Sequence, residues 1–293
     1  MQLNFEPIDL DRQQDYHQRL SQCPQIASDY SFINIWGWKD EYGLLWAWHE
    51  SIVCIKQTIP SEMLWAPVGD WHGTDWGAML QSAKEHCPKL IRVPEALLHI
   101  WEHKTNIPFG ASESRDHWDY LYKRQELVDL KGNRYHKKKN LVNQFKKKYE
   151  FTYLPFGPEM VTQAQYMQED WCTWRDCESS ETLAAENKAI AKVLDTWQML
   201  NGITGGALLV DQDLAAYTVA EVLPDKTIVI HFEKGCPGFK GSYQAINQMF
   251  LAQDENPGSD IVNREQDIGD EGLRKAKLSY HPVDFIRKYE VVF

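Results

Sequence analysis

Three apolar runs separated by two short turn-forming segments constrain the second half of the chain most strongly. The runs are Thr204–Val210, Leu214–Val222 and Thr227–Glu233. The segments between them, 211–213 and 223–225, contain Asp and Pro, which favour turns. Strands joined by such short connections pair antiparallel, because a parallel pairing needs a crossover of about a dozen residues or more. The sequence therefore predicts an antiparallel meander of three strands.

Helices and two further strands are predicted around this meander. Two helices precede it, at Gly157–Arg175 and Ser180–Leu200, and the second has apolar residues at helical spacing. A loop rich in Gly follows the third strand and leads into another helix. The remaining predicted elements are a strand at Asp260–Asn263, a helix at Asp270–Ser279 and a strand at Phe285–Phe293.

The first half repeats the same order of elements more faintly. The predicted strands are Leu44–Trp48, Ile52–Gln57, Met63–Ala66, Leu90–Val93 and Trp118–Arg124, and the predicted helices are Thr74–Cys87 and Pro94–His103. An order shared by two halves of similar length indicates a duplicated fold. We therefore expect an α/β (α+β) protein with two domains, residues 1–128 and 129–293, each a mixed, mainly antiparallel sheet flanked by helices.

The start of the chain and its hydropathy predict a cytoplasmic location. Met1–Asp11 carries acids where a secretory signal carries bases, and no run of about eighteen apolar residues occurs. In that reducing compartment the six scattered cysteines are expected to be buried thiols rather than disulfides or a zinc site. Most of the aromatic residues, which include twelve Trp, are expected to fill the core.

The segment Lys131–Lys148 concentrates positive charge in a chain whose net charge is −11. It holds eight Lys and Arg residues and no Asp or Glu. Its apolar residues predict a helix that packs on one side and exposes its lysines on the other. Such a run is usually a solvated face, but here it lacks the Glu partners that would stabilise the helix. Contact with the phosphates of an anionic ligand is the alternative interpretation.

Motifs of several large enzyme classes are absent from the sequence. It contains no Gly-x-x-x-x-Gly-Lys-Ser/Thr, no His-Glu-x-x-His and no Gly-x-Ser-x-Gly. Nucleotide hydrolysis, zinc proteolysis and serine hydrolysis therefore have no support. The ten histidines show no metal-ligand spacing, so no metal is expected.

Three stretches resemble bacterial proteins of the phosphatidylglycerol lysyltransferase C-terminal domain family. They are LKGNRYHKKKNLVNQFKKKY (130–149), VIHFEKGCPGFKGSYQAINQMFL (229–251) and IVNREQDIGDEGLRKAKLSYHPVDFIRKYEV (261–291). The element order is also similar to that of Gcn-five-related N-acetyltransferases. The resemblance implies two tandem acetyltransferase-like domains, and its characterised members move an aminoacyl group from aminoacyl-tRNA onto a lipid. Their multi-helix membrane domain is missing here, so a lipid acceptor is not implied.

Two residues of the second half are candidate catalytic groups. The resemblance places Glu233 at a strand end where acetyltransferases often have a carboxylate that accepts the proton of the attacking amine. It places Tyr280 at the end of the last helix, where they commonly have a tyrosine that protonates the leaving group. The alternatives are a strand-end carboxylate paired with Lys234 or another base, and a phenol that anchors a helix end before Pro282.

The donor is expected to contact the glycine-rich loop and the basic helix. A helix N-terminus entered through glycines can bind phosphate, because its first backbone N–H groups lack partners within the helix. The predicted donor-binding residues are Arg134, Lys137, Lys138, Lys139, Lys234, Lys240, Gly241 and Ser242. Acetyltransferases carry Gln/Arg-x-x-Gly-x-Gly/Ala here, whereas this chain has Lys240 at the last position, so the coenzyme A pattern is not met. A turn with an ordinary helix cap explains the glycines equally well.

Polar residues after the strand at Asp260–Asn263 are candidate ligand contacts. Polar side chains at strand ends of α/β folds commonly meet ligands. The candidates at the strand end are Asn263, Arg264 and Glu265, and the family resemblance implies Lys275 and Lys277 as further candidates. A structural ion-pair network is the competing interpretation, and acids before bases along the last helix also suit its dipole.

Two functional hypotheses follow. The first is an acyltransferase that moves an aminoacyl group from aminoacyl-tRNA to an unknown amine or hydroxyl acceptor, with the donor as cosubstrate and no tightly bound cofactor. The second is a non-catalytic module that binds an anion or tRNA on an acyltransferase scaffold. Transfer of an acyl group from acyl-coenzyme A (acyl-CoA) to an amine is the remaining alternative. The partners are therefore expected to be tRNA or another polyphosphate donor.

Overall fold

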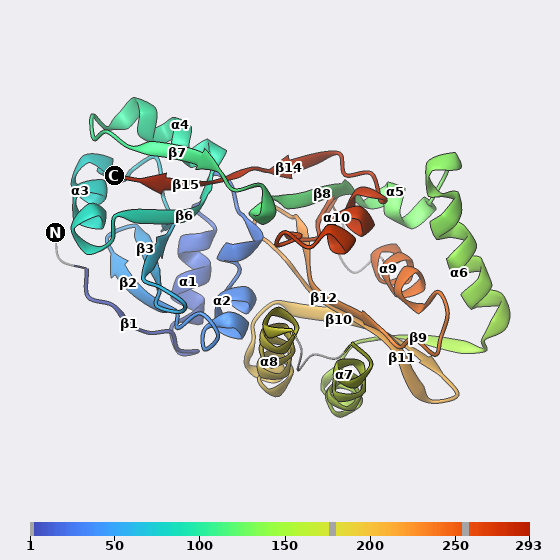
Figure 1. Cartoon of the computed structure of the whole chain (residues 1–293). Helices are drawn as coiled ribbons and strands as arrows, with labels where there is room; N and C mark the ends of the chain where they lie inside the picture. The colour runs from blue at the N-terminus through green and yellow to red at the C-terminus, as the bar shows by residue number, and fades with distance from the viewer. Residues whose placement is uncertain (1–2, 176–179, 254–257) are drawn as a thin grey trace. The chain divides into compact units, whose positions relative to one another are not determined.

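The computed structural model describes residues 3–175, 180–253 and 258–293, and its chain divides into two compact units (Figure 1). The N-terminal unit contains the residues up to Asp119 together with Gln266–Glu271 and Phe285–Phe293. The C-terminal unit contains Tyr120–Glu265 and Gly272–Asp284. The sequence predicts a single cut between residues 128 and 129. That cut does not coincide with the division into compact units, because Phe285–Phe293 belongs to the N-terminal unit.

The N-terminal unit is built around an eight-stranded mixed sheet. Seven strands follow the order β1-β2-β3-β4-β6-β15-β7, and β5 pairs with β3. Their bounds are β1 Glu6–Pro7, β2 Leu45–His49, β3 Ile52–Gln57, β4 Met63–Trp65, β5 Val68–Gly69, β6 Lys89–Pro94, β7 Gly110–Glu113 and β15 Lys288–Val292. β4 and β6 pair in parallel, whereas the other recorded pairs are antiparallel. The helices are α1 Gln13–Leu20, α2 Phe32–Trp38, α3 Trp76–His86 and α4 Glu95–Lys104.

Aromatic side chains fill the core of the N-terminal unit. Four tryptophans, Trp46, Trp71, Trp76 and Trp101, are almost completely buried. Trp71 and Trp76 each donate their indole N–H to a backbone carbonyl at 2.8 Å, so their polar atoms are satisfied. The interpretation of the aromatic residues as mainly core side chains is confirmed for this unit.

A cluster of buried charges lies within the N-terminal unit. Lys288 of β15 donates to Asp119 at 2.6 Å and is also ion-paired with Asp29. Arg92 of β6 forms an ion pair with the same Asp29, and Arg92 has a left-handed backbone with φ of 57°. Burial acts to raise the pKa of Asp29, but Arg92 and Lys288 hold it well below its usual value. Removal of one partner of such a buried ion pair strongly destabilises the folded protein, because it leaves a buried charge uncompensated.

The C-terminal unit is built around a seven-stranded mixed sheet in the order β14-β8-β13-β12-β11-β10-β9. The bounds are β8 Asp119–Lys123, β9 Phe151–Pro155, β10 Ile203–Val210, β11 Asp213–Val222, β12 Ile228–Gly235, β13 Ile261–Asn263 and β14 Asp284–Ile286. β10, β11 and β12 form the predicted antiparallel meander. β12 and β13 pair in parallel, but only at Ile228↔Val262 and Val229↔Asn263. The remainder of β12, up to Gly235, is therefore unpaired on the β13 side.

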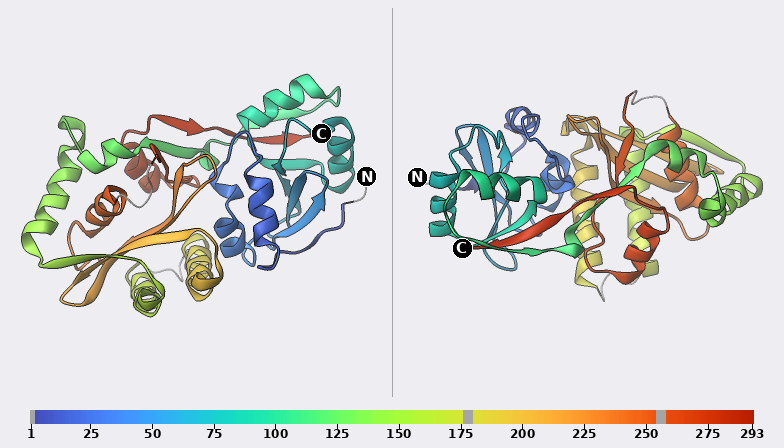
Figure 2. Two further views of the ribbon diagram at one scale, coloured as in Figure 1. Left: turned by 180° about the vertical axis from the view of Figure 1, so that it is seen from behind. Right: turned by 90° about the horizontal axis from the view of Figure 1, so that it is seen from above.

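Helices cover both faces of this sheet (Figures 1 and 2). Their bounds are α5 Arg124–Asp129, α6 His136–Lys148, α7 Val161–Arg175, α8 Glu181–Asp195, α9 Ser242–Ala252 and α10 Glu271–Leu278. Helix α9 packs on β10, β11 and β12 and against α6, whereas α7 and α8 pack together on the opposite face. The apolar residues of α6 and α9 share a core with those of β10 and β11, including Phe145, Leu208 and Ile246.

Two predicted strands belong to the sheet of the other half. The strand predicted at Trp118–Arg124 is β8, which pairs with β13 in the sheet of the C-terminal unit. The strand predicted at Phe285–Phe293 divides into β14 and β15, and β15 lies between β6 and β7 of the N-terminal unit. The mixed α/β fold with two sheets flanked by helices is confirmed, but the exchange of strands between the halves was not predicted.

Candidate active site

The pleat of β12 sends two predicted site residues to opposite faces of the sheet. Successive side chains of a strand alternate between faces, so Glu233 and Lys234 cannot serve the same site. Glu233 points towards α9, where Asn247 donates to it. Lys234 is buried on the other face and forms an ion pair with Glu186 of α8 at 2.7 Å. Lys234 therefore lies apart from Glu233, and its ammonium group is paired with the partly exposed carboxylate of Glu186. Donor binding by Lys234 stays a prediction.

Glu233 is the centre of a polar cluster beside the unpaired part of β12. Arg264, the first residue after β13, donates through Nη2 to Oε1 of Glu233 at 2.8 Å. Asn247 of α9 donates through Nδ2 to Oε2 at 2.9 Å. The Glu233 side chain is only 8% exposed. Both carboxylate oxygens thus already accept a hydrogen bond, one of them from a cation.

Tyr280 lies in the same cluster. Its ring centroid is 4.8 Å from Cζ of Arg264, and its hydroxyl forms hydrogen bonds with Arg264 and Gln244. Burial raises the pKa of the Tyr280 phenol to about 12, although the charge of Arg264 opposes this rise. The phenol therefore carries its proton at neutral pH and is placed as a hydrogen-bond donor or acid.

One lysine of the basic helix joins this cluster. Nζ of Lys138 lies 4.1 Å from the centroid of the Tyr280 ring. Its neighbours Lys137 and Lys139 are exposed, whereas Lys138 is partly buried. Burial and the nearby charge of Arg264 lower the pKa of Lys138, and Glu233 opposes that change. Four predicted residues from four parts of the chain therefore meet in one place: Lys138, Glu233, Arg264 and Tyr280.

The turn after β13 fixes the position of Arg264. Oδ1 of the buried Asn263 accepts from the backbone N–H of Glu265 at 2.8 Å. Lys277 donates through Nζ to the backbone carbonyl of Arg264 at 2.6 Å. Asn263 and Lys277 therefore hold the backbone around Arg264 in place. Lys275 is exposed on α10, away from these contacts.

A buried histidine holds the other end of this turn and was not identified from the sequence. His231 forms a hydrogen bond through Nδ1 to Glu265 at 2.8 Å and through Nε2 to Glu221 at 2.9 Å. Burial acts to lower the pKa of His231, but the two carboxylates raise it to about 9. The imidazolium therefore donates to both glutamates at neutral pH. The sequence did offer a signal for this pair, because Glu221 and His231 each lie within an otherwise largely apolar strand.

A bulge in the sheet positions His231. Val219 pairs with Phe232 and the next residue, Ala220, pairs with Ile230, so His231 has no partner on β11. Bulges re-aim side chains and occur often beside functional sites. Here the bulge places the His231 ring between Glu221 of β11 and Glu265.

The glycine-rich loop packs against the basic helix. Gly241 has a φ of 90°, and a Cβ there would lie 2.4 Å from the backbone oxygen of Leu141 in α6. Ser242 is buried and donates its backbone N–H to Phe239 within the loop. Tyr149 donates to the carbonyl of Gly238 and accepts from the N–H of Lys240. Gly241 and Ser242 therefore have structural roles, and only the exposed Lys240 side chain faces outwards.

The basic helix exposes most of its charge. Lys137, Lys139 and Lys147 are exposed, and no ion pair is recorded for them with any residue that the structure describes. Lys146 differs from them because it donates to Gln248 at 3.1 Å. Without recorded ion-pair partners, these exposed lysines remain available for phosphate contacts.

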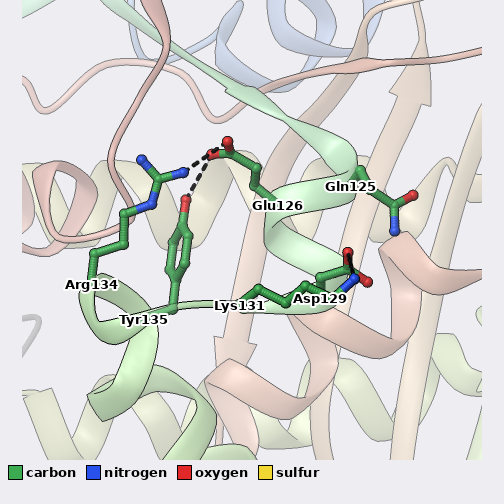
Figure 3. Close-up of a pocket in the computed structure, with 6 residues that line it drawn as sticks. All are labelled: Gln125, Glu126, Asp129, Lys131, Arg134 and Tyr135. Atoms are coloured by element: carbon green, nitrogen blue, oxygen red, sulfur yellow. Dashed lines mark hydrogen bonds and ion pairs between the residues drawn. The ribbon is translucent and has the colours of Figure 1, made fainter.

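Arg134 lies in a small cavity of about 170 Å³ beside the site (Figure 3). The cavity is lined by Gln125, Glu126, Asp129, Lys131, Arg134 and Tyr135. Its charges are paired within the wall, Arg134 with Glu126 and Lys131 with Asp129, each at 2.8 Å. The Tyr135 hydroxyl lies 3.0 Å from Glu126 and 3.1 Å from the backbone carbonyl of Tyr280. Arg134 is therefore engaged in an ion pair rather than presented to a donor.

The described residues lack a metal-binding cluster and a membrane-spanning helix. Across the described ranges, no group of three or more His, Cys, Asp or Glu residues is placed to hold a metal ion. Within the same ranges, no helix has both the length and the apolar character needed to cross a membrane. The four cysteines whose thiols the structure describes, Cys23, Cys54, Cys87 and Cys236, are free, while the side chains of Cys172 and Cys177 lie outside the described residues.

Comparison with known proteins identifies a matching family model and solved structures with the same fold. The family model for the C-terminal part of phosphatidylglycerol lysyltransferase matches residues 21–292. A conserved protein of unknown function from Bacteroides thetaiotaomicron is 28% identical, with a TM-score of 0.90 and full coverage of both chains. The structure of L-PGS from Bacillus licheniformis has the same fold, with a TM-score of 0.68 at 10% identity over 100% of this chain and 94% of that one.

One curated protein matches part of this chain. An uncharacterised protein of Mycoplasmoides gallisepticum is 24% identical over 174 residues. The match covers 59% of this chain and 55% of the relative, so the chain spans about half the length of the curated relative that it matches.

Proposed function

The chain belongs to the phosphatidylglycerol lysyltransferase C-terminal family, and from this premise we propose that it is an acyltransferase that uses aminoacyl-tRNA as its donor. The acceptor is an amine or hydroxyl compound. The reaction takes place in the cytoplasm, where aminoacyl-tRNA is made. The observation that carries this proposal is the meeting of Lys138, Glu233, Arg264 and Tyr280 beside the unpaired part of β12.

Tyr280 is the proton donor of the proposed reaction. The acceptor attacks the ester carbonyl carbon of the aminoacyl group, and the bond between this carbon and the ribose oxygen breaks. The leaving oxygen takes the Tyr280 proton, which the phenol keeps at neutral pH because its pKa is about 12. Arg264 stabilises the resulting phenolate, since its guanidinium group is bonded to the same hydroxyl.

Glu233 is assigned to positioning rather than to proton acceptance. Its two oxygens are occupied by Arg264 and Asn247 at 2.8 and 2.9 Å. A carboxylate bonded to a guanidinium group is a poor base, because protonation would break that ion pair. The role of base predicted for Glu233 is therefore replaced, in this proposal, by the role of holding Arg264 against Tyr280.

The exposed lysines of α6 support tRNA as the donor. Lys137, Lys139 and Lys147 are exposed on the same helix that brings Lys138 to Tyr280. A polyphosphate backbone bound to this helix would thus lie near the acid. Acyl-CoA has less support, because Gly241 and Ser242 of the loop are used in packing against α6 and within the loop.

The test is acceptor-dependent loss of the aminoacyl ester. Radiolabelled aminoacyl-tRNA is incubated with the protein and with amines, peptides or phosphatidylglycerol vesicles, and the labelled product is separated. Tyr280→Phe should lower the transfer rate by about 10²–10⁴-fold with little change in tRNA affinity. Tyr166→Phe is the matched control, because Tyr166 is 65% exposed.

Parallel reactions with acetyl-CoA and a thiol reagent test the alternative donor. Binding of tRNA without transfer to any acceptor would favour the non-catalytic module. Equal activity of Tyr280→Phe and the parent protein would remove Tyr280 from the mechanism.

A further inference from the structure

Lys138 differs from the other lysines of its helix in its surroundings. It is partly buried, and its Nζ lies over the Tyr280 ring rather than in solvent. Lys137 and Lys139, on either side of it, are exposed. A lysine that binds a phosphate backbone must reach outwards, as these two neighbours do. The inward direction of Lys138 therefore calls for a different role from phosphate contact.

The groups that face Lys138 are those of the candidate site. They are the Tyr280 ring at 4.1 Å, the Arg264 guanidinium group and the Glu233 carboxylate. Glu233 is bonded to Arg264, which leaves the positive charge of Arg264 and partial burial to act on the ammonium group. Both of these influences favour the neutral amine, whereas Glu233 and the ring face favour the ammonium form.

The proposed reaction also lacks a base. Transfer to an amine or hydroxyl releases a proton from the acceptor, and Glu233 is already occupied by two donors. In the described part of the site, Lys138 is the side chain that can exist as a neutral acceptor beside Tyr280.

We propose that Lys138 is the proton acceptor of the transfer reaction and that it returns the proton to Tyr280. The acceptor's N–H or O–H proton moves to Nζ as the new bond to the carbonyl carbon forms. The ribose oxygen leaves with the proton of Tyr280. The Lys138 ammonium group then reprotonates the phenolate, directly or through one water molecule, which restores both groups. This inference rests on the proposed function.

Lys138→Arg separates a base from a simple positive charge. Arginine keeps the charge but cannot accept a proton near neutral pH. We expect the transfer rate to fall by about 10²–10⁴-fold, while tRNA affinity stays nearly unchanged. Lys226→Arg is the matched control that keeps the parent rate, because Lys226 is exposed and lies outside the site. The rate of the parent protein should rise with pH, and this rise should disappear in Lys138→Arg.

A second measurement needs no substrate. Lysines labelled with ¹³C at Cε are titrated by NMR, and the Lys138 signal is assigned by its absence from Lys138→Arg. The pKa of Lys138 should lie below the usual value of a lysine, because burial and the charge of Arg264 lower it. Melting temperatures of all the variants exclude loss of folding as the cause of a lower rate.

The outcomes distinguish the two proposals. If the parent protein transfers no aminoacyl group to any acceptor, the proposed function fails, and the role of Lys138 fails with it. If the parent protein is active and Lys138→Arg is equally active, only the role of Lys138 is overturned. A Lys138 pKa at or above the usual value of a lysine also overturns it.

Discussion

The buried imidazolium of His231 should make the stability of the protein depend on pH. In the unfolded chain the pKa of this histidine returns to 6.5, whereas in the folded protein it is about 9. At about 1.4 kcal/mol for each pH unit, this difference corresponds to roughly 3 kcal/mol of folding free energy. The side chain is fully buried between Glu221 and Glu265, so solvent screening does not reduce this figure appreciably.

The direction of the effect follows from the proton count. Between pH 6.5 and 9 the folded state holds one more proton on His231 than the unfolded state does, so the stability falls as the pH rises. The contribution is complete below pH 6.5 and is lost as the pH passes through about 9. We therefore expect the free energy of unfolding to decrease by roughly 3 kcal/mol over this range.

Urea unfolding at a series of pH values measures this decrease. His231→Gln should abolish this slope and should be less stable than the parent protein at pH 6.5, because two buried carboxylates lose their cation. His72→Gln, at an exposed position, should keep the parent slope. NMR titration should find His231 charged up to about pH 9, and His117, whose pKa burial lowers to about 4, neutral throughout. Parallel stability curves for the parent protein and His231→Gln would refute the reasoning.

Three further perturbations test other parts of the structure. Gly241→Ala should destabilise the protein by at least about 1 kcal/mol more than Gly202→Ala. Both glycines have left-handed backbones, but of the two only Gly241 lies against a neighbouring helix. Equal losses of stability in urea unfolding would contradict this close packing. Lys288→Met should lower the free energy of unfolding by about 3–5 kcal/mol, because it leaves Asp29 and Asp119 buried without their shared ammonium group. A loss below about 1 kcal/mol would show that the stability of these charges does not depend on one another. Joint replacement of Lys137, Lys139 and Lys147 by Gln should make the slope of the logarithm of the tRNA-binding constant against the logarithm of the salt concentration shallower by about 2–3. Lys226→Gln should leave this slope unchanged. An unaltered slope in the triple variant would show that the three lysines are only a solvated surface.

The meander and its flanking helices could be predicted from the sequence because their signals are local. Turn residues separate β10, β11 and β12, and each strand lies within two residues of its predicted bounds. The partners of β8 and β15 could not be predicted in this way. Strand pairing between residues more than a hundred positions apart leaves no trace in the period of apolar residues.

The candidate site was predicted unevenly for a related reason. Arg264 was predicted from its position after a strand, and Tyr280 from the resemblance of its surrounding stretch to a known family. The structure brings both together with Lys138 and Glu233. The separation of Lys234 from Glu233 could be predicted, because adjacent side chains of a strand point to opposite faces of its sheet. The position of His231 depends on a bulge, which single-sequence patterns do not specify.

The exchange of β8 and β15 has a consequence for how the protein is made. The N-terminal unit acquires an interior strand and the ammonium group of Lys288 only from residues 288–292. A nascent chain that has left the ribosome as far as Asp119 therefore has Asp29 and Asp119 without their shared lysine and lacks the strand between β6 and β7. The sheet of the first half cannot be completed before residues 288–292 have been made. Genes that encode the two halves separately should accordingly yield folded material only when both are expressed together.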